Sequence, residues 1–444
     1  MALKKIKKEL KMINKILTFL KKLVNDNSFG RYEVGLLVIA FLGRGLFLFN
    51  RWFGISEYEF LLINQKGIFA PLCHSRGDCF LPVSLLLINL PRHLLRIGGT
   101  IDVFYWERIM MLTLGMISLF SLWKIASILF PKQQLLQRLF LAVLAINPQF
   151  VFVNRFITPI GIAFSLAGLG SWLLLEGGKN ERKRGWIAAG LLVLLMAMFS
   201  SLQAFLVVWL ILLLITAGLK SKKVDVKTLV GVLAGSMFLW LFYLYSHHLL
   251  TIRRIMPFLE DPGVINAINA SRGTEINFGI PKLARILFNK GYYLIFWLAR
   301  YWRQFSLSNI FSLVENSQSS LIIAAPPMLL FFAPFFVIGL FNSFRLMSRG
   351  KSWGLLAITL VLAIPTSFYQ NFFHQDLFVF ALLPISFYVA LGLKLMEKKK
   401  AWKWFLASLL VVNVVISYYK INRDFFRSNR LINQELYQQL ESND

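Results

Sequence analysis

The chain has 444 residues, of which 57% are hydrophobic and only 16% are charged, and its mean hydropathy is +0.63. This composition excludes an ordinary soluble protein and is typical of an integral membrane protein. The formal charge of +27 would suit a nucleic-acid-binding protein, but most of the excess falls in short loops between apolar runs, where it indicates membrane topology instead.

Residues 1–31 carry many lysines on one face of a helical pattern, with Ile, Leu and Phe on the other face. They lack the uninterrupted apolar core and the small-residue cleavage site of a signal peptide. We therefore predict a cytoplasmic basic amphipathic helix that lies on anionic lipid. A plain solvated segment is the alternative.

Apolar runs of about 20 residues, the length that crosses about 30 Å of hydrocarbon, predict an all-α polytopic membrane protein with about eleven transmembrane helices. The spans are expected near residues 32–50, 105–130, 136–153, 158–176, 185–199, 202–219, 226–245, 320–341, 352–369, 372–393 and 402–419. Away from the ends of these spans, the main charged side chain is Arg44.

The apolar run 185–219 is assigned two spans. As one helix it would be roughly 50 Å long, which is too long for a single crossing. Basic clusters flank both of its ends, so two crossings place both clusters on the same side of the membrane. The break is expected at Ser200, Ser201 and Gln203.

The short loops then alternate between basic and neutral, as the positive-inside rule requires when the N-terminus is cytoplasmic. The transmembrane domain is predicted over residues 32–419, with long outer loops at 51–104 and 246–319. The tail 420–444 is predicted to be extracytoplasmic, and the protein to be a multi-pass protein of the cell membrane. Within the first outer loop, runs near 57–66 and 80–97 are expected to be interfacial helices.

The chain has two cysteines, Cys73 and Cys79, both in the first outer loop. So close a pair in an oxidising compartment is a disulfide candidate, with two free thiols as the alternative. His74 and Asp78 add no recognised zinc spacing, so we predict no metal site. The sequence also lacks the nucleotide-binding and hydrolase motifs that would support ATP-driven transport or hydrolysis.

Acidic side chains are scarce, yet several lie on the predicted outer face. Glu57 and Glu59 follow the first span, Asp78 lies in the same loop, and Glu107 lies at the start of the second span. An acid at the outer end of a span is a functional candidate because burying it carries a desolvation cost. Glu57 is interpreted either as a catalytic base or as an interfacial cap or salt-bridge partner. Glu107 is interpreted as a structural partner of Arg108.

Cations also gather on the predicted outer face and could hold a phosphate by bidentate hydrogen bonds. The set comprises Arg155, Arg253, Arg254, Arg300 and Arg303. Transfer of a sugar from a lipid-linked phosphate needs a carboxylate for the acceptor's proton and cations for the leaving phosphate. Contact of Arg253 and Arg254 with lipid headgroups is the alternative to substrate binding.

The order of these features resembles the GT-C superfamily of polytopic glycosyltransferases, in particular protein O-mannosyltransferases and aminoarabinose transferases. "GISEYEF" stands at the family's acidic motif after the first span, and "YWERIMMLTLGM" opens the second span with Arg108 at the matching position. "LAVLAINPQFVFVNRFITP" places Arg155 at a matching basic position, and "FFHQDLFVFALLP" keeps His374 and Pro384 of a late outer segment. The resemblance covers most of the chain and implies a GT-C-like bundle.

The resemblance implies a glycosyltransferase with a polyprenyl-phosphate-linked sugar donor and a protein, lipid or glycan acceptor. It implies Glu57 as the base, Glu59 or Asp78 as assistants, and substrate binding by Arg108, Arg155, Arg253, Arg254 and His374. No cofactor is required, a divalent metal is compatible, and the partners are membrane lipids and not nucleic acid. The family's first acid is Ser56 here, so an inactive scaffold of a cell-envelope complex is one alternative. A lipid or solute transporter is another, although no internal repeat supports it.

Overall fold

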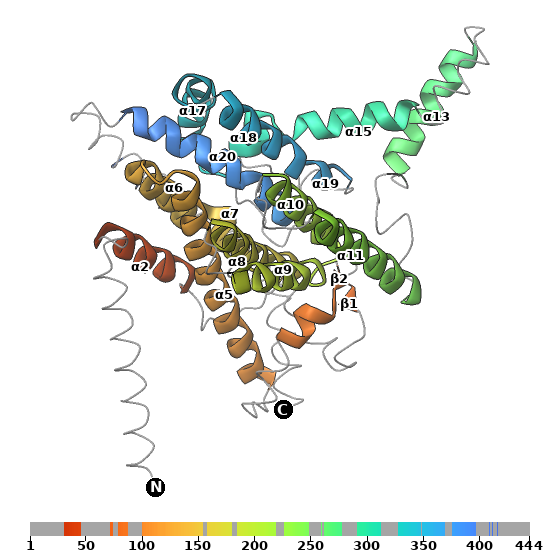
Figure 1. Ribbon diagram of the computed structural model, residues 1–444. Coiled ribbons are helices and arrows are strands. Elements are labelled where there is room, and N and C mark those ends of the chain that lie inside the picture. Colours follow the sequence, from red (N-terminus) through yellow and green to blue (C-terminus); the bar gives the residue numbers. More distant parts are fainter. Residues whose placement is uncertain are drawn as a thin grey trace.

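The computed structural model shows an all-helical arrangement with a bundle at its centre (Figure 1). It describes residues 31–45, 72–73, 79–87, 100–153, 158–179, 184–218, 226–247, 259, 262–277, 291–311, 327–347, 349–368, 375–396, 408, 411 and 415. The predicted amphipathic helix before Arg31 and the tail 420–444 lie outside these residues. The eleventh predicted span is described at Ser408, Val411 and Val415, each of which is helical.

The long helices of the bundle are α2 (Arg31–Gly45), α5 (Thr100–Leu129), α6 (Gln134–Ile146), α8 (Pro159–Lys179), α9 (Arg184–Met198), α10 (Ala204–Gly218), α11 (Val226–Ser246), α17 (Ala333–Leu346), α18 (Arg349–Leu362) and α20 (Gln375–Met396). The remaining elements are α7 (Pro148–Val153), α13 (Pro262–Asn277), α15 (Tyr292–Arg303), α16 (Leu307–Phe311), η5 (Leu330–Phe332), α19 (Ile364–Ser367) and the antiparallel strands β1 (Leu72–Cys73) and β2 (Cys79–Phe80).

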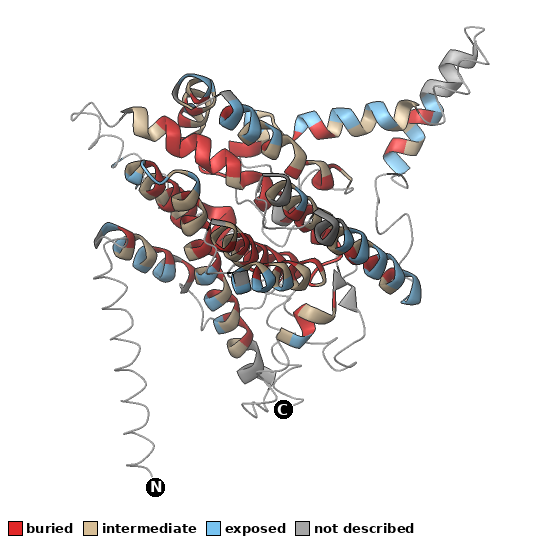
Figure 2. Cartoon of the chain, viewed as in Figure 1, coloured by how far each residue is buried: buried red, intermediate tan, exposed pale blue. Residues whose placement is uncertain are grey.

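Four helices of the described residues are long and apolar enough to cross a membrane. They are Tyr105–Leu129, Pro159–Gly178, Gly350–Ser367 and Leu377–Leu395. Shorter apolar helices overlap the other predicted spans, apart from the last one at 402–419. These spans are 32–50, 136–153, 185–199, 202–219, 226–245 and 320–341. Buried residues concentrate where these helices face one another, and exposed residues lie on their outer sides (Figure 2). The protein is therefore an all-α polytopic membrane protein, as predicted.

Helices α2 and α6 run in the same direction. At their starts, Arg138 Nε donates a hydrogen bond to Glu33 Oε1 at 2.6 Å. At their ends, the Arg44 guanidinium donates to the carbonyl oxygens of Leu144 at 3.4 Å and Ala145 at 3.3 Å. Parallel first and third spans are what an alternating path through the membrane requires. The relative directions in the predicted topology are thus confirmed for this pair.

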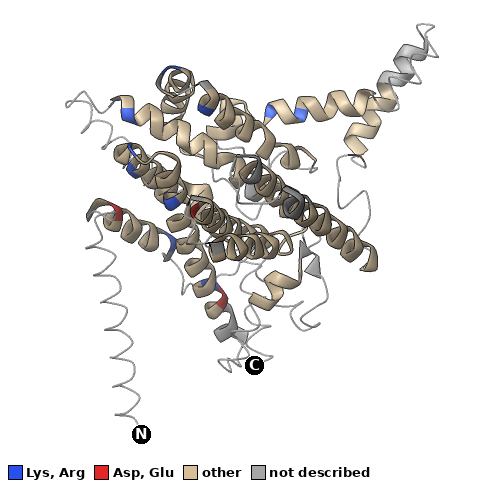
Figure 3. Ribbon diagram, viewed as in Figure 1, with Lys and Arg blue, Asp and Glu red and all other residues tan. Residues whose placement is uncertain are grey.

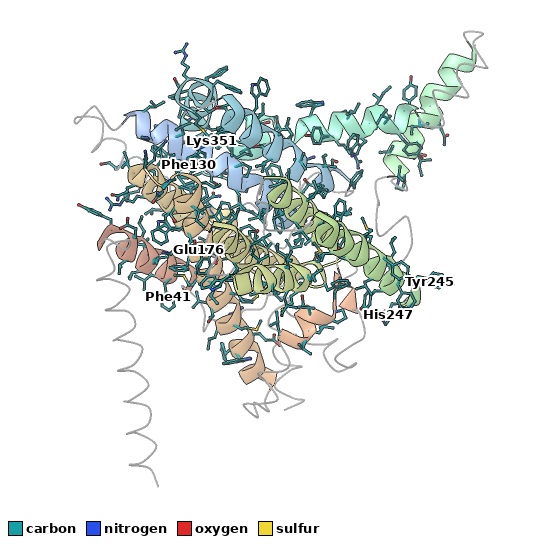
Figure 4. The ribbon with its side chains drawn as sticks, in the orientation of Figure 1. Phe41, Phe130, Glu176, Tyr245, His247 and Lys351 are labelled. Atoms are coloured by element: carbon teal, nitrogen blue, oxygen red, sulfur yellow. The ribbon has the colours of Figure 1, made fainter. Side chains whose placement is uncertain are left out.

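The opposite end of the bundle gathers basic loops. Lys394 Nζ, near the end of α20, donates to Gln133 Oε1 at 3.0 Å, just before α6. The Lys351 ammonium lies 5.7 Å from the centroid of the Phe130 ring. We call this the Lys394 end and the opposite end, where α2 and α6 finish, the Arg44 end. Figure 4 shows Lys351 and Phe130 together, far from His247 at the finish of α11, and Figure 3 shows cations at the neighbouring ends of α6 and α20.

Three of the predicted cytoplasmic loops therefore meet at the Lys394 end. They are the loop at Lys132, the loop "RLMSRGK" and the loop "KLMEKKKAWK". Which side of the membrane this end faces stays a prediction from the charge distribution.

The two-span assignment of the run 185–219 is confirmed. Helix α9 ends at Met198 and α10 begins at Ala204, with a turn over residues 199–203 between them. The Ser201 hydroxyl oxygen accepts a hydrogen bond from the Ala204 N–H at 3.1 Å, which satisfies one of the unpaired donors at the start of α10.

Two predicted spans differ from the structure. The span 136–153 is split into α6 and α7, because Pro148 disfavours helical backbone at Asn147, whose ψ is 127°. The span 320–341 was placed too early, since α17 begins only at Ala333, after the short η5. Pro334 stands in the first turn of α17, where a missing N–H leaves no helical bond unmade.

Glycines allow the closest helix contact among the described residues. A Cβ on Gly339 of α17 would overlap the carbonyl oxygen of Tyr388 on α20. A Cβ on Gly392 of α20 would overlap the carbonyl oxygen of Phe335. Small residues at such a crossing let two backbones approach and gain van der Waals contact, which is the main attraction between helices in lipid.

Candidate functional site

One predicted substrate-binding residue, Arg108, lies within the described side chains. It follows Glu107 in the first turns of α5 at the Arg44 end, and both side chains are buried, with exposures of 5% and 0%. Charged groups are costly inside a membrane protein and mark functional or tightly satisfied positions.

Most of the predicted site lies outside the described residues. This applies to the three candidate catalytic acids, to three of the arginines and to the late histidine. They are Glu57, Glu59, Asp78, Arg155, Arg253, Arg254 and His374. Their roles stay predictions, but the described residues that flank them locate the ends of their segments.

Arg44 is buried to 1% exposure and lies in the last turn of α2. Its bonds to the carbonyls of Leu144 and Ala145 satisfy two of the four acceptors that the end of α6 cannot pair internally. The positive charge also complements the negative end of the α6 dipole. The mid-span charge that the sequence singled out is thus a cap for a neighbouring helix.

We expect Arg44→Leu to destabilise the protein by about 2 kcal/mol or more, because it leaves two buried carbonyls without a donor. Arg44→Lys should recover part of this loss, since an ammonium can still reach one carbonyl. Thermal unfolding in detergent measures both variants. Equal stability of Arg44→Leu and the unchanged protein would contradict the capping role.

Sequence reasoning missed two amides at the α6–α7 break. Asn147 and Gln149 are both fully buried, at 0% exposure. Neither Nδ2 nor Oδ1 of Asn147 has a hydrogen-bond partner among the atoms of the structure. A buried amide without a partner carries a free-energy cost and points to a bound polar group or water. The "NP" dipeptide at 147–148 is the signal that could have marked this break.

The segment that holds Arg155 is anchored on both sides at this end of the bundle. Val153, at the end of α7, stands just before this segment, and Thr158 stands after it, next to the start of α8. Both side chains are buried. The Thr158 hydroxyl accepts a hydrogen bond from the Gly161 N–H at 3.0 Å. A Cβ on Gly161 would overlap the Val153 carbonyl oxygen and lie 3.0 Å from Met111 Cε, one turn beyond Glu107 on α5. The Arg155 segment thus begins and ends beside the buried start of α5.

The first outer loop docks on the turn between α9 and α10. The N–H of Leu81 donates to the Ser200 carbonyl at 3.2 Å, and that of Val83 donates to the Phe199 carbonyl at 3.3 Å. Residues 82–87 are helical, which agrees with part of the interfacial helix predicted over 80–97, whereas 57–66 lies outside the described residues. Two segments that were separately predicted to be outer loops therefore touch each other.

The strands β1 and β2 place Cys73 directly opposite Cys79 in an antiparallel register. Facing residues in such a ladder have Cα atoms about 4.5–5.5 Å apart, within the range that a disulfide spans. The register thus supports the predicted disulfide, which stays a prediction.

We expect the mature protein to show no thiol that reacts with maleimide until it is reduced, with a mass two hydrogens below the dithiol form. Cys73→Ser should free one reactive thiol and lower the unfolding temperature, because the bridge restrains the unfolded loop. Two thiols that react fully in the unreduced protein would contradict the bridge.

No group of three or more His, Cys, Asp and Glu side chains that could hold a metal ion occurs within the described ranges. What the described Arg44 end offers is a set of buried donors, including the guanidinium of Arg108 and the amide of Asn147. Such donors can stabilise an anion in a medium of low dielectric constant. Among the described side chains at this end, Glu107 is a candidate proton acceptor, and the sequence of the loop 46–99 adds the acids Glu57, Glu59 and Asp78.

Comparison with known proteins gives no match to a family model and no match to a curated protein. Among solved structures, the chain is similar to an Archaeoglobus fulgidus oligosaccharyltransferase in complex with Zn and sulfate, with a TM-score of 0.49 and 14% identity, over 88% of this chain and 52% of that one.

It is also similar to the archaeal oligosaccharyltransferase AglB from Archaeoglobus fulgidus in complex with an inhibitory peptide and a dolichol-phosphate, with a TM-score of 0.49 and 12% identity over 92% and 56% of the two chains. For the apo form of the Archaeoglobus fulgidus enzyme the TM-score is 0.44 at 14% identity. The chain spans about half the length of these archaeal proteins.

Proposed function

We propose that the protein is a membrane glycosyltransferase that moves a sugar from a polyprenyl-phosphate-linked donor to a protein, lipid or glycan acceptor. The reaction is placed at the Arg44 end, which we assign to the extracytoplasmic face. This proposal rests on the order of motifs that resembles the GT-C superfamily and on the positions at which their segments join the bundle. It includes a cell-membrane location with a cytoplasmic N-terminus.

The observation that carries the proposal is the convergence of separate segments on one end. The acidic loop leaves α2 just after Arg44 and returns at Thr100, near buried Arg108. The segment of Arg155 starts and finishes beside the same end of α5. His374 directly precedes α20, whose other end carries Lys394. The ends of these segments at one end of the bundle support the proposal that their residues act in one reaction.

In the proposed reaction, an acceptor hydroxyl oxygen attacks the anomeric carbon of the donor. Its proton passes to the Glu57 carboxylate, while the bond between the anomeric carbon and the phosphate oxygen breaks. The electron pair leaves with the polyprenyl phosphate, whose growing charge is stabilised by Arg155, Arg253 and Arg254. Attack opposite to the leaving group inverts the anomeric configuration. Glu59 or Asp78 orients the acceptor.

Arg108 and His374 are assigned to binding the donor phosphate or its sugar. The long polyprenyl chain would lie in the lipid against the apolar helices. No step in this scheme calls for a cofactor, and a divalent metal could assist only by neutralising phosphate charge.

The test is sugar transfer by the purified full-length protein in liposomes. Donors are short-chain polyprenyl phosphates that carry radiolabelled mannose, glucose or aminoarabinose, and acceptors come from membranes of a strain that lacks the gene. We expect one donor to lose its label to an acceptor only when the protein is present. A folded protein that consumes none of these donors with any native acceptor would favour the scaffold interpretation.

A further inference from the structure

Helix α15 carries a polar face that the proposed mechanism does not use. Trp297, Arg300, Tyr301 and Gln304 recur at helical spacing and so share one face. That face turns toward the bundle, where the Tyr301 hydroxyl donates to the Leu360 carbonyl at 2.8 Å. Burial raises the pKa of Tyr301 above its ordinary value, which keeps the phenol protonated as this donor.

The adjoining face of α15 is apolar and exposed. Leu294, Leu298 and Trp302 recur every four residues and have exposures of 55%, 38% and 59%. In a protein surrounded by lipid, such a stripe is positioned to meet acyl chains. The helix thus separates a lipid-facing side from a buried polar side.

Two side chains on the polar face have buried hydrogen-bonding atoms without partners among the described residues. Gln304 is 3% exposed, and both its Nε2 and its Oε1 lack a partner. The indole N–H of Trp297 is buried and also lacks one. Unsatisfied buried groups of this kind are uncommon in native proteins and point to a missing ligand or water.

The geometry restricts what the ligand can be. The Trp297 ring is stacked against Tyr301, with centroids 5.8 Å apart, and against Phe368, at 5.7 Å. Two aromatic rings already pack against the Trp297 ring, and its polar group is the N–H, which can only donate. Gln304 can both donate and accept, and Arg300 adds a positive charge on the same face. The set favours an anionic oxygen next to a hydroxyl.

The size of the face adds a second restriction. Trp297 and Gln304 are seven residues apart, which is about 10 Å along a helix. A lone inorganic anion cannot reach both, whereas a phosphate ester with a hydroxyl-bearing headgroup can. Trp297 stacks on Phe368, which lies between α19 and the start of α20. Because the other end of α20 carries Lys394, the polar face lies toward the Arg44 end.

We propose that the Trp297–Arg300–Gln304 face of α15 is a binding site for a phosphorylated, hydroxyl-bearing headgroup of a membrane lipid. This proposal rests on the proposed function in one respect only, which is that the sugar-carrying donor lipid would be one lipid with such a headgroup. An ordinary phospholipid headgroup has the same chemistry, and free phosphate shares the charge. Binding at this site requires no turnover and no acceptor.

The test is ligand binding to the full-length protein in detergent, read as a dissociation constant and as a shift in Tm. The ligands are farnesyl phosphate, a short-chain phosphatidylglycerol and inorganic phosphate. We expect Arg300→Gln to weaken binding of a lipid ligand about tenfold, as loss of a charged hydrogen bond does. Arg345→Gln is the matched control, because Arg345 is exposed in the last turn of α17, outside the set of candidate phosphate-binding arginines, and the change removes the same charge. It should change binding less than about twofold.

Gln304→Leu separates a ligand site from a merely strained core. Removing an unpaired buried amide should raise the Tm of the ligand-free protein by about 2 °C. The same change should abolish most of the Tm shift that the ligand produces. Tightest binding of phosphatidylglycerol would support a hydroxyl-bearing headgroup. Binding of farnesyl phosphate, which carries no such headgroup, as tightly or more tightly would overturn that part of the proposal.

Equal binding by all variants, or binding by inorganic phosphate alone, would overturn the proposal. Its failure differs from failure of the proposed function. An inactive protein that still binds lipid phosphate through Arg300 keeps this site, and an active one with unaltered binding in Gln304→Leu and Arg300→Gln loses it.

Discussion

Glu57→Gln should lower the rate of sugar transfer by about a hundredfold or more, because the amide cannot accept the proton of the incoming hydroxyl. Glutamine keeps the size and the hydrogen-bonding reach of the side chain, so binding of the donor should change little. The measurement is kcat and KM with the donor that the purified protein uses. The expected signature is a loss in kcat with KM for the donor kept within about threefold.

Glu59→Gln should have a smaller effect, about tenfold, if Glu59 only orients the acceptor. Glu176→Gln is the control, because it makes the same chemical change at a distant position. Glu176 lies near the end of α8, toward the Lys394 end. This substitution should leave transfer unchanged. Full activity in both Glu57→Gln and Glu59→Gln would remove the proposed base and direct attention to Asp78.

Gly392→Ala should be among the most destabilising single changes in the described part of the chain, by about 3 kcal/mol. The added methyl group would overlap the Phe335 carbonyl oxygen, and backbone atoms cannot turn aside as a flexible side chain can. Gly339→Ala meets the Tyr388 carbonyl oxygen in the same way. Both changes should force α17 and α20 apart and lower the yield of folded protein.

Gly354→Ala is the matched control, since nothing lies within 4 Å of a Cβ at that helical position. It should be neutral or slightly stabilising, because alanine has the higher helix propensity. Thermal unfolding in detergent and titration with SDS measure all three variants. Wild-type stability of Gly392→Ala would mean that α17 and α20 do not cross where the structure has them.

The span positions followed from the sequence because lipid imposes a simple constraint. A crossing segment must be apolar for about 20 residues and must satisfy its own backbone hydrogen bonds. The same constraint resolved the run 185–219 into two helices. It failed at Asn147, where a break in the helix stays buried against other helices and the apolar run therefore continues across it, so hydropathy gave no sign of the break and the Asn147–Pro148 dipeptide was the available signal.

The candidate site was predictable only as a set of residue types. The scarcity of acids and the position of outer loops identified Glu57 and Glu59 as candidates, and the resemblance to the GT-C superfamily added Arg108. They gave no sign that Asn147 and Gln304 would be buried without partners, because an isolated amide in a sequence carries no pattern. Arg44 was noticed as a charge in a span, but its role depended on acceptors 100 residues later in the chain.

Hydropathy and loop charge alone determined that this is a polytopic helical protein and how its crossings alternate, because each crossing obeys the same local requirement of length and polarity. The tertiary structure alone decided that the turn after Phe199 receives the first outer loop, that Gly339 and Gly392 let two backbones touch, and that α15 turns its polar face inward. These features depend on which helices become neighbours, and contacts between distant segments leave no periodic trace in one sequence.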